Sequence, residues 1–383
     1  MAKRKAAVAL AAICLLLPFG ALAQEEEEAG AFIAAAKAAV LIEEHTGTVL
    51  YAQNENVPLP MASTTKVMTA LMVLEYGHLD EVVTTSRNAF GVPGSSIYLS
   101  LGEKLTLEQM LTGLMLASGN DAAVAIAEHI GGTVENFCRK MTERAAELGC
   151  TDTVFQTPHG LPNAAHHTTA HDLALIAREA MRYPLFRKLV STQRGSIPWE
   201  GRPYNRILNN KNKLLSTYEG ATGIKTGFTR AAGRCLVFGA QRNGLEVVGV
   251  VLNCPDWFNQ AAKLMDYGFE HYQYVSMLSD GETVRTVPVE GGEEGNVVVR
   301  LAGELAAPMP MDAFPDIEID LPDKLTAGFS QDQAVGTIRL TFHGQVLAER
   351  PLVASKGVSP RTFRSNIGRI FENWTIAGPV VEK

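Results

Sequence analysis

The sequence predicts an α/β fold of the α+β kind: a central antiparallel sheet flanked by helices, followed by a small all-β domain. Two pairs of apolar runs, each joined by a tight turn, indicate antiparallel strand pairs. Between these pairs, apolar residues recur at helical spacing. Beyond about Val275 the chain changes to short β-like runs that are divided by Gly, Pro and Asp.

The turns define the strand pairs. Thr46-Gly47 joins the first pair, and Arg242-Asn243-Gly244 joins the second, because Asn-Gly favours a two-residue hairpin. The expected strands of the sheet are residues 38–43, 48–52, 235–238 and 245–252. The β-like runs of the last part of the chain are residues 286–289, 297–301, 317–321 and 335–342.

The helices are predicted from their apolar faces and from the residues that end them. A helix over residues 64–74 has its apolar residues on one face and ends at Gly77. Further helices are expected at residues 107–116, 122–130 and 258–268. Ser63 therefore stands at the start of a helix, and residues 118–120 form the break between two others.

Ser63 and Lys66 are three residues apart, so their side chains share one face of the first helical turn. A serine hydroxyl becomes a good nucleophile when a neighbouring group takes its proton. A lysine can take that proton when it is neutral, and burial beside other cations lowers its pKa toward that state. Taken alone, the pair is also typical of a helix cap followed by a surface lysine.

Two further short motifs accompany this pair. The turn at residues 118–120 can direct Ser118 and Asn120 into a cleft, although Ser, Gly and Asn are also ordinary turn formers. Lys225-Thr226-Gly227 is expected at the start of an edge strand, where Gly227 permits the close approach of a ligand. The alternative for Lys225 is a surface lysine in a β-turn.

In this order, the three motifs resemble those of the serine DD-peptidase and penicillin-binding protein superfamily, which also recur in class A β-lactamases. The likeness is greatest to the low-molecular-weight D-alanyl-D-alanine carboxypeptidases of the peptidase S11 type, and it covers about residues 36–272. Segments outside the motifs share it: residues 157–161 (TPHGL), 167–173 (HTTAHDL), 209–215 (NNKNKLL) and 227–233 (GFTRAAG).

The resemblance implies a serine carboxypeptidase that removes the terminal D-Ala from peptidoglycan stem peptides and is acylated by β-lactams. Ser63 would be the acylated nucleophile and Lys66 its base. Ser118 would pass the proton to the leaving amine, and Asn120 would hold Lys66 and the substrate amide. We expect no cofactor, and the sequence has no metal-ligand spacing. The resemblance leaves the group that activates the deacylating water unassigned.

The third motif would bind the substrate. Lys225 would tune the local field, Thr226 would bind the terminal carboxylate, and Gly227 would allow close approach. The backbone N–H groups of Ser63 and Phe228 would form the oxyanion hole.

One departure from the family concerns the substrate carboxylate. Many of these carboxypeptidases carry an arginine shortly before the last helix of the domain. Here residues 253–259 read NCPDWFN, without an arginine near Trp257. Carboxylate recognition would then depend on Thr226, with Arg230 as a further candidate, and substrate preference stays open.

Three other functions share these motifs. Class A β-lactamases deacylate through a glutamate ahead of the third motif, but residues 150–173 contain only Asp152 and Asp172 as acids, and Asp172 is expected to cap a helix. A DD-transpeptidase shares every motif but usually keeps an N-terminal membrane helix. A catalytically inactive peptidoglycan-binding relative is disfavoured because every catalytic position is filled.

The ends of the chain predict its location. Lys3-Arg4-Lys5, an apolar stretch over residues 6–19 and Ala21-Leu22-Ala23 are typical of a signal peptide, so the protein would be exported to the cell wall and the outer face of the cytoplasmic membrane. The expected domains are a signal peptide at 1–23, a catalytic domain at 24–274, a small β-rich domain at 275–356 and a tail at 357–383.

The tail predicts attachment to a membrane surface. Its aromatic and apolar residues share one helical face beside basic residues, as in helices that lie in the membrane interface. These apolar residues are Phe363, Ile367, Ile370, Phe371 and Trp374. The alternative is a tail helix that packs on its own domain.

Composition limits the partners. The net charge of −7 and the lack of a basic tract argue against nucleic acid. Four cysteines follow the predicted signal peptide; Cys235, in a predicted buried strand, is expected to be a free thiol, and the pairing of Cys138, Cys150 and Cys254 is left open. The histidines at 166, 167 and 171 are interpreted as loop and helix-entry residues and not as a metal site.

Overall fold

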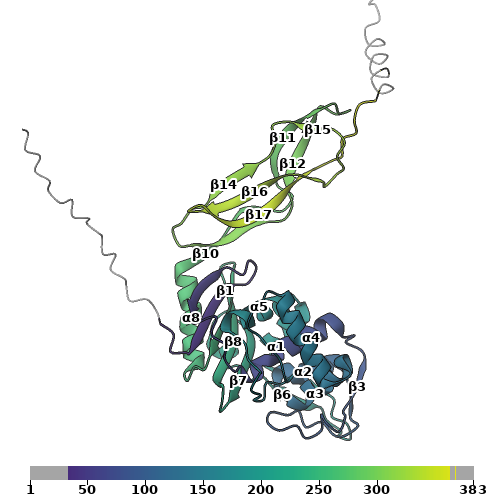
Figure 1. Ribbon diagram of the computed structural model, residues 1–383, viewed down its shortest axis with the longest axis vertical. Helices are drawn as coiled ribbons and strands as arrows, with labels where there is room; N and C mark the ends of the chain where they lie inside the picture. Colours follow the sequence, from purple (N-terminus) through teal and green to yellow (C-terminus); the bar gives the residue numbers. More distant parts are fainter. Residues whose placement is uncertain (1–32, 363–366, 368–383) are drawn as a thin grey trace, which may run out of the picture. The chain divides into compact units, whose positions relative to one another are not determined.

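The structure is a computed structural model that describes residues 33–362 and Ile367 (Figure 1). The predicted signal peptide, and the apolar face of the predicted tail helix apart from Ile367, lie outside the described residues. Among the helices that are described, none has the length and apolar character needed to cross a membrane.

A five-stranded antiparallel sheet, in the order β2-β1-β9-β8-β7, forms the centre of the first part of the chain. Its strands are β1 (Ala38–Glu43), β2 (Val49–Gln53), β7 (Ala221–Thr229), β8 (Gly233–Arg242) and β9 (Leu245–Leu252). Both predicted hairpins are confirmed. Asn243 and Gly244 have φ values of 49° and 84°, which is the positive-φ pair that a type I′ turn requires.

The predicted position of Lys225 at the start of a strand is wrong in one respect. β7 is an edge strand as expected, but it begins at Ala221, so Lys225 lies in its middle. The first residues of β7 include Thr and Gly and have little apolar pattern, so the sequence did not indicate a strand there. In the structure they pair with β8, beginning with Ala221 opposite Ala240.

Helices cover both faces of the sheet (Figure 1). They are η1 (Ala62–Thr65, a 3₁₀ turn), α1 (Lys66–Tyr76), α2 (Leu107–Leu116), α3 (Asn120–Gly131), α4 (Val134–Glu147), α5 (Ala170–Met181), α6 (Pro184–Ser191), α7 (Leu214–Thr217) and α8 (Trp257–His271). Val40 and Ile42 of β1 face the core that the helices of the 60–190 region form. Leu41 faces Gly268 of α8 on the other side. Because both faces of β1 and β9 are buried, these two strands are almost continuously apolar.

Asp172 does not cap α5, contrary to the prediction. The Thr169 hydroxyl occupies the cap position and accepts a hydrogen bond from the Asp172 backbone N–H at 3.0 Å. The Asp172 carboxylate is therefore free to accept from the backbone N–H of Asp152 at 2.9 Å and from Thr153 Oγ1 at 2.7 Å. It fixes the segment before α5 instead of the start of the helix.

Two short antiparallel strand pairs and a second set of strands complete the described fold. The pairs join β3 (Val82–Thr84) with β4 (Lys104–Thr106) and β5 (Arg194–Ile197) with β6 (Arg206–Asn209). The strands beyond α8 are β10 (Tyr272–Leu278), β11 (Thr283–Glu290), β12 (Asn296–Leu301), β13 (Leu305–Pro310), β14 (Asp316–Asp320), β15 (Leu325–Thr326), β16 (Ala334–Phe342) and β17 (Gln345–Ala354).

These later strands confirm the predicted β-rich texture. They form a six-stranded sheet in the order β14-β16-β17-β12-β11-β15 and a pair, β10-β13, around an apolar core of their own. Each of the four predicted β-like runs overlaps one strand: β11, β12, β14 and β16. β13 (LAAPMP) gave no signal because Ala and Pro are poor strand formers.

All four cysteines within the described residues are buried free thiols. Burial raises the pKa of Cys138, Cys150 and Cys235 to about 12 and that of Cys254 to about 11. The expectation for Cys235 is confirmed, and the other three, whose pairing the sequence left open, are also unpaired.

Candidate active site

Ser63 lies in the 3₁₀ turn η1, directly before α1. The neighbouring hydroxyls fix this turn: Thr64 Oγ1 donates to the carbonyl of Met61 at 2.5 Å, and Thr65 Oγ1 donates to the carbonyl of Ala62 at 2.8 Å. Local hydrogen bonds of this kind suit Ser and Thr at the start of a helix. They leave Ser63 as the hydroxyl of the turn that lines a cleft.

Lys66 is fully buried, and its Nζ has three neighbours. It lies 3.1 Å from Ser63 Oγ, 2.7 Å from Asn120 Oδ1 and 2.8 Å from the carbonyl oxygen of His159. The last two are carbonyl oxygens and can only accept. A neutral amine has two N–H groups and one lone pair, so these acceptors use both N–H groups and leave the lone pair toward the Ser63 hydroxyl.

The electrostatics of the site favour that neutral amine. Burial, and then the charges of Lys225 and Lys211, hold the pKa of Lys66 well below the usual 10.5, while Asp121 opposes the shift. Burial followed by Lys211 lowers the pKa of Lys225 to about 7. Burial also lowers the pKa of Lys211. Three lysines thus share a site in which Lys211 disfavours the charge of Lys225, and both disfavour the charge of Lys66.

Ser118 lies in the turn between α2 and α3, and Asn120 is the first residue of α3. Asn120 Oδ1 accepts from Lys66, while its Nδ2 donates to the carbonyl of Pro93 at 2.6 Å, so the orientation of the amide is fixed at both ends. Ser118 has a φ of +63°, which is rare for a residue other than glycine. This strained backbone holds the Ser118 side chain at the cleft.

Two glycines let the segments meet at η1. A Cβ on Gly227 would lie 2.9 Å from the backbone nitrogens of Ser63 and Thr64, so β7 approaches the turn closely. A Cβ on Gly160 would lie 1.8 Å from the carbonyl oxygen of Ala62. The sequence suggested that Gly227 permits the close approach of a ligand. In the structure, the lack of a Cβ at Gly227 permits the close approach of the η1 backbone.

The cleft has a volume of about 610 Å³. Of the predicted site residues, Ser63, Ser118, Thr226, Gly227 and Phe228 line it. The other three, Lys66, Asn120 and Lys225, are buried. Lys225 Nζ donates to the carbonyl of Thr226 at 2.9 Å.

Sequence reasoning missed several residues of the site. Ser95, Lys211, Lys213, Arg234, Asp256, Trp257 and Phe258 also line the cleft. Lys211 lies inside the 209–215 segment that carried part of the family likeness, so its place in that segment was an available signal. Arg230, the suggested carboxylate ligand, is exposed and is not among the residues that line the cleft. That suggestion is therefore not supported.

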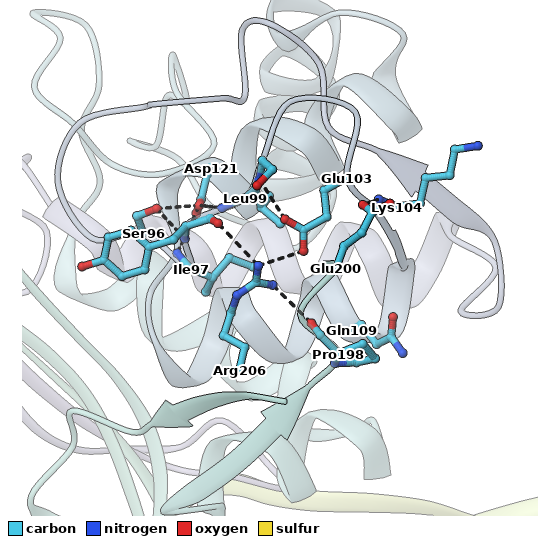
Figure 2. A network of polar contacts seen from close by, with 12 residues as sticks. Ser96, Ile97, Leu99, Glu103, Lys104, Gln109, Asp121, Pro198, Glu200 and Arg206 are labelled. Carbon is cyan, nitrogen blue, oxygen red and sulfur yellow. Dashed lines mark hydrogen bonds and ion pairs between the residues drawn. The ribbon is translucent and has the colours of Figure 1, made fainter. Parts of the chain in front are cut away.

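A polar network fixes the loop of residues 95–103 (Figure 2). Ser95, at the start of this loop, lines the cleft. The Asp121 carboxylate accepts from Ser96 Oγ at 2.6 Å and from the backbone N–H groups of Ile97 and Leu99 at 3.1 Å. Arg206 Nη2 forms a buried ion pair with Glu103 Oε1 at 2.8 Å.

This loop carries Ser95 into the site. The carbonyl of Ser95 accepts from the backbone N–H of Asn120 at 2.7 Å, and its Oγ accepts from Lys211 Nζ at 2.8 Å. The network around Asp121 therefore positions the wall against which Asn120 and Lys211 are held.

His166 contacts η1 through the Thr65 hydroxyl. Its Nδ1 accepts from the backbone N–H of Gln156 at 3.0 Å, so in the neutral ring Nε2 carries the proton that bonds to Thr65 Oγ1 at 2.8 Å. Burial, and then His167, lower its pKa to about 4. Among the described residues, no group of three His, Cys, Asp or Glu side chains has an arrangement that could hold a metal ion.

Two protein families match the chain by sequence profile. The family described as D-alanyl-D-alanine carboxypeptidase, peptidase S11, matches residues 24–256, which is more than half of the chain. The family described as penicillin-binding protein 5, C-terminal domain, matches residues 272–359.

Individual relatives agree with these families. D-alanyl-D-alanine carboxypeptidase DacF of Bacillus subtilis (strain 168) is 35% identical over 357 residues, covering 89% of this chain and 90% of the relative. Penicillin-binding protein 5 from Haemophilus influenzae superposes with a TM-score of 0.73 at 27% identity, covering 86% of this chain and 98% of that chain.

A solved structure of a mutant of the Streptomyces K15 DD-transpeptidase is 36% identical, with a TM-score of 0.60, and covers 62% of this chain and 99% of that chain. The matched profiles, the relatives and the fold, an antiparallel sheet between helices followed by a β-rich region, lead to one conclusion. The chain belongs to the peptidase S11 family of D-alanyl-D-alanine carboxypeptidases and is a serine-type D-Ala-D-Ala carboxypeptidase.

Proposed function

We propose that this carboxypeptidase acts through an acyl-enzyme on Ser63, with Lys66 as the base that takes the serine proton. The contacts of Lys66 Nζ carry the proposal: two carbonyl oxygens accept its N–H groups, and the lone pair of the neutral amine faces Ser63 Oγ at 3.1 Å. The lowered pKa of Lys66 supports the same state.

The remaining motif residues complete the reaction. Ser63 Oγ attacks the carbonyl carbon of the penultimate D-Ala, and the oxyanion is held by the backbone N–H groups of Ser63 and Phe228. As the C–N bond breaks, Ser118 passes the proton from Lys66 to the leaving amine, and D-Ala departs. Asn120 holds Lys66 and the substrate amide. Water then cleaves the ester, which releases the shortened peptide and restores the Ser63 hydroxyl.

The edge of β7 binds the substrate. Thr226, Gly227 and Phe228 line the cleft, so the Thr226 hydroxyl can bind the terminal carboxylate while Gly227 keeps β7 against Ser63. Lys225 lowers the pKa of Lys66 through its charge. β-Lactams acylate Ser63 by the same attack and inhibit the enzyme.

Transpeptidation is the second candidate, because the chain is 36% identical to a protein that is described as a DD-transpeptidase. The two activities share the acyl-enzyme and differ in the acceptor, which is water in one and an amine in the other.

One experiment separates these possibilities. Purified protein is incubated with a pentapeptide ending in D-Ala-D-Ala, with and without an acceptor amine, and free D-Ala and ligated peptide are measured. We expect D-Ala release without ligation, and at least a roughly 10³-fold loss of rate in Ser63→Ala, because removal of a nucleophile removes the covalent route. Release at the wild-type rate by Ser63→Ala would refute the proposal. Peptide mass spectrometry after penicillin treatment identifies the acylated residue.

We further propose that the chain acts outside the cytoplasm: residues 1–23 as a signal peptide, 24–274 as the catalytic domain, 275–356 as the β-rich domain and 357–383 as a membrane-surface anchor. The composition of the two ends supports this division. N-terminal sequencing of the mature protein tests the cleavage site. Flotation of the full chain and of a chain ending at residue 356 with lipid vesicles tests the anchor, since only the full chain should bind.

A further inference from the structure

We propose that Arg234 binds the terminal carboxylate of the substrate and so sets the preference of the enzyme for a free C-terminus. This inference rests on the proposed Ser63 site. The substrate ends in a carboxylate, and the described residues that line the cleft contain three cations: Lys211, Lys213 and Arg234.

The register of the sheet brings Arg234 next to the proposed substrate strand. Arg234 of β8 is paired directly with Phe228 of β7. Directly opposed side chains of an antiparallel pair lie on the same face, with Cβ atoms about 4.5–5.5 Å apart. Since side chains alternate along a strand, Thr226 lies on that face as well. Thr226, Phe228 and Arg234 all line the cleft that Ser63 enters.

The guanidinium of Arg234 is oriented without a carboxylate partner. Its contacts within the described residues are with the carbonyl of Pro255, to which Nη1 donates, and with the ring of Trp257, whose centroid lies 5.8 Å from Cζ. A guanidinium has five N–H donors in a planar fork, so most of the donors stay available for a bidentate bond to a carboxylate.

The other cations of the site fit this role less well. Lys211 Nζ donates to Ser95 Oγ at 2.8 Å, which ties it to the loop that Asp121 holds. Lys66 and Lys225 are buried behind the cleft. A lysine is a point charge, whereas the planar fork of arginine matches both oxygens of a carboxylate. Trp257 and Pro255 lie in the 253–259 segment, so that segment orients an arginine that comes from a neighbouring strand.

The test compares two substrates that differ only in this carboxylate: a pentapeptide ending in D-Ala-D-Ala and the same peptide with a C-terminal carboxamide. Release of D-Ala or of D-alaninamide is followed by mass spectrometry for the wild type and for Arg234→Ala, Arg234→Lys, Arg230→Ala and Lys213→Ala. The full chain is used throughout. Folding of each variant is checked by thermal unfolding and by end-point acylation of Ser63 with penicillin.

We expect Arg234→Ala to lower kcat/KM for the free acid about 10–100-fold, which corresponds to loss of a charge-assisted hydrogen bond, and to leave kcat/KM for the carboxamide unchanged within a factor of about three. For the free acid, Arg234→Lys should have a kcat/KM between those of the wild type and Arg234→Ala. An equal loss on both substrates, or an acid-selective loss in Arg230→Ala or Lys213→Ala instead, would overturn the assignment of Arg234. If the wild type releases product from neither peptide, the proposed function fails, and this inference fails with it.

Discussion

The Nζ atom of Lys66 lies 3.1 Å from the Oγ atom of Ser63 and has carbonyl oxygens at its two other contacts. This arrangement makes the protonation state of Lys66 the quantity that controls acylation. A protonated amine would direct a third N–H at the Ser63 hydroxyl and could not take its proton. A neutral amine directs its lone pair there.

The pH dependence of acylation should therefore follow Lys66 and respond to Lys225. We expect kcat/KM to rise as the pH passes upward through the lowered pKa of Lys66. Lys225, with a pKa of about 7, is one of the cations that lower that pKa. Replacing Lys225 by Met should let the pKa of Lys66 rise, so the acidic limb of the profile moves to higher pH.

This prediction is measured as kcat/KM between pH 5 and pH 10 for the wild type, Lys225→Met and Lys225→Arg. Arginine keeps its charge at every pH, so Lys225→Arg should keep the acidic limb at or below its wild-type position. An acidic limb at the same pH in Lys225→Met and the wild type would contradict the coupling of the two lysines.

The buried His166 should make stability depend on pH. Its pKa is lowered from 6.5 in the unfolded chain to about 4 in the folded protein. Below pH 6.5 the unfolded state therefore binds more protons, and stability is lost as the pH falls from about 6.5 toward 4. The full effect is on the order of 3 kcal/mol, at 1.36 kcal/mol for each pKa unit.

Urea unfolding at several values between pH 7.5 and pH 4.5 measures this effect. His166→Gln can keep a donor toward Thr65 Oγ1 but cannot titrate. We expect His166→Gln to be less stable than the wild type at pH 7.5 and to lose less stability than the wild type as the pH falls. Equal slopes of free energy against pH in the two proteins would show that His166 does not contribute, since His159, whose pKa burial lowers to about 3, titrates in both.

The sequence predicted the helix, turn or strand that holds each motif better than it predicted the contacts between the motifs. The observed bounds of α2 equal the predicted ones, and the turn at Ser118 and the edge strand at Lys225 are present. The contacts that join the three motifs, such as Gly227 against the Ser63 backbone, depend on spacing between segments that no local pattern contains.

One wrong prediction and one unsupported suggestion have specific physical causes. Thr169 and Asp172 are three residues apart and both suit the start of a helix, so the sequence alone did not decide which one caps α5. Arg230 and Arg234 both follow Lys225 closely. The arginine that enters the cleft is decided by the register that pairs Phe228 with Arg234, and the letters do not specify that register.

The ion pair between Arg206 and Glu103 should be costly to break from one side. Both side chains are almost fully buried, and their atoms are 2.8 Å apart. Removing only Arg206 leaves the Glu103 carboxylate buried without its partner, for which we expect a loss of about 3–5 kcal/mol in Arg206→Met. The double variant Arg206→Met, Glu103→Leu should regain a substantial part of that loss.

The measurement is the free energy of unfolding in urea for Arg206→Met, Glu103→Leu and the double variant. Because the pair holds the loop that carries Ser95, Arg206→Met should also lower kcat/KM at temperatures where the protein is folded. Additive losses in the double variant would contradict an interaction between the two residues.

The contact between Gly160 and Ala62 gives the last prediction. Gly160 has a φ of +86°, and a Cβ there would lie 1.8 Å from the Ala62 carbonyl oxygen. Gly149 has a φ of +88°, but nothing lies within 4 Å of a Cβ at that position. Gly149→Ala should therefore cost only the backbone penalty of about 1 kcal/mol. Gly160→Ala carries that penalty and must also push the 157–161 segment away from η1.

That displacement moves the His159 carbonyl, which is one of the two acceptors of Lys66. We therefore expect Gly160→Ala to lose more stability than Gly149→Ala and, in addition, to lower the rate of Ser63 acylation by penicillin at least about tenfold. Unfolding in urea and stopped-flow acylation measure the two effects. If both variants acylate at the wild-type rate, the His159 carbonyl does not help to hold Lys66 in its reactive orientation. The reactivity of Lys66 would then not depend on the close approach of the 157–161 segment to η1.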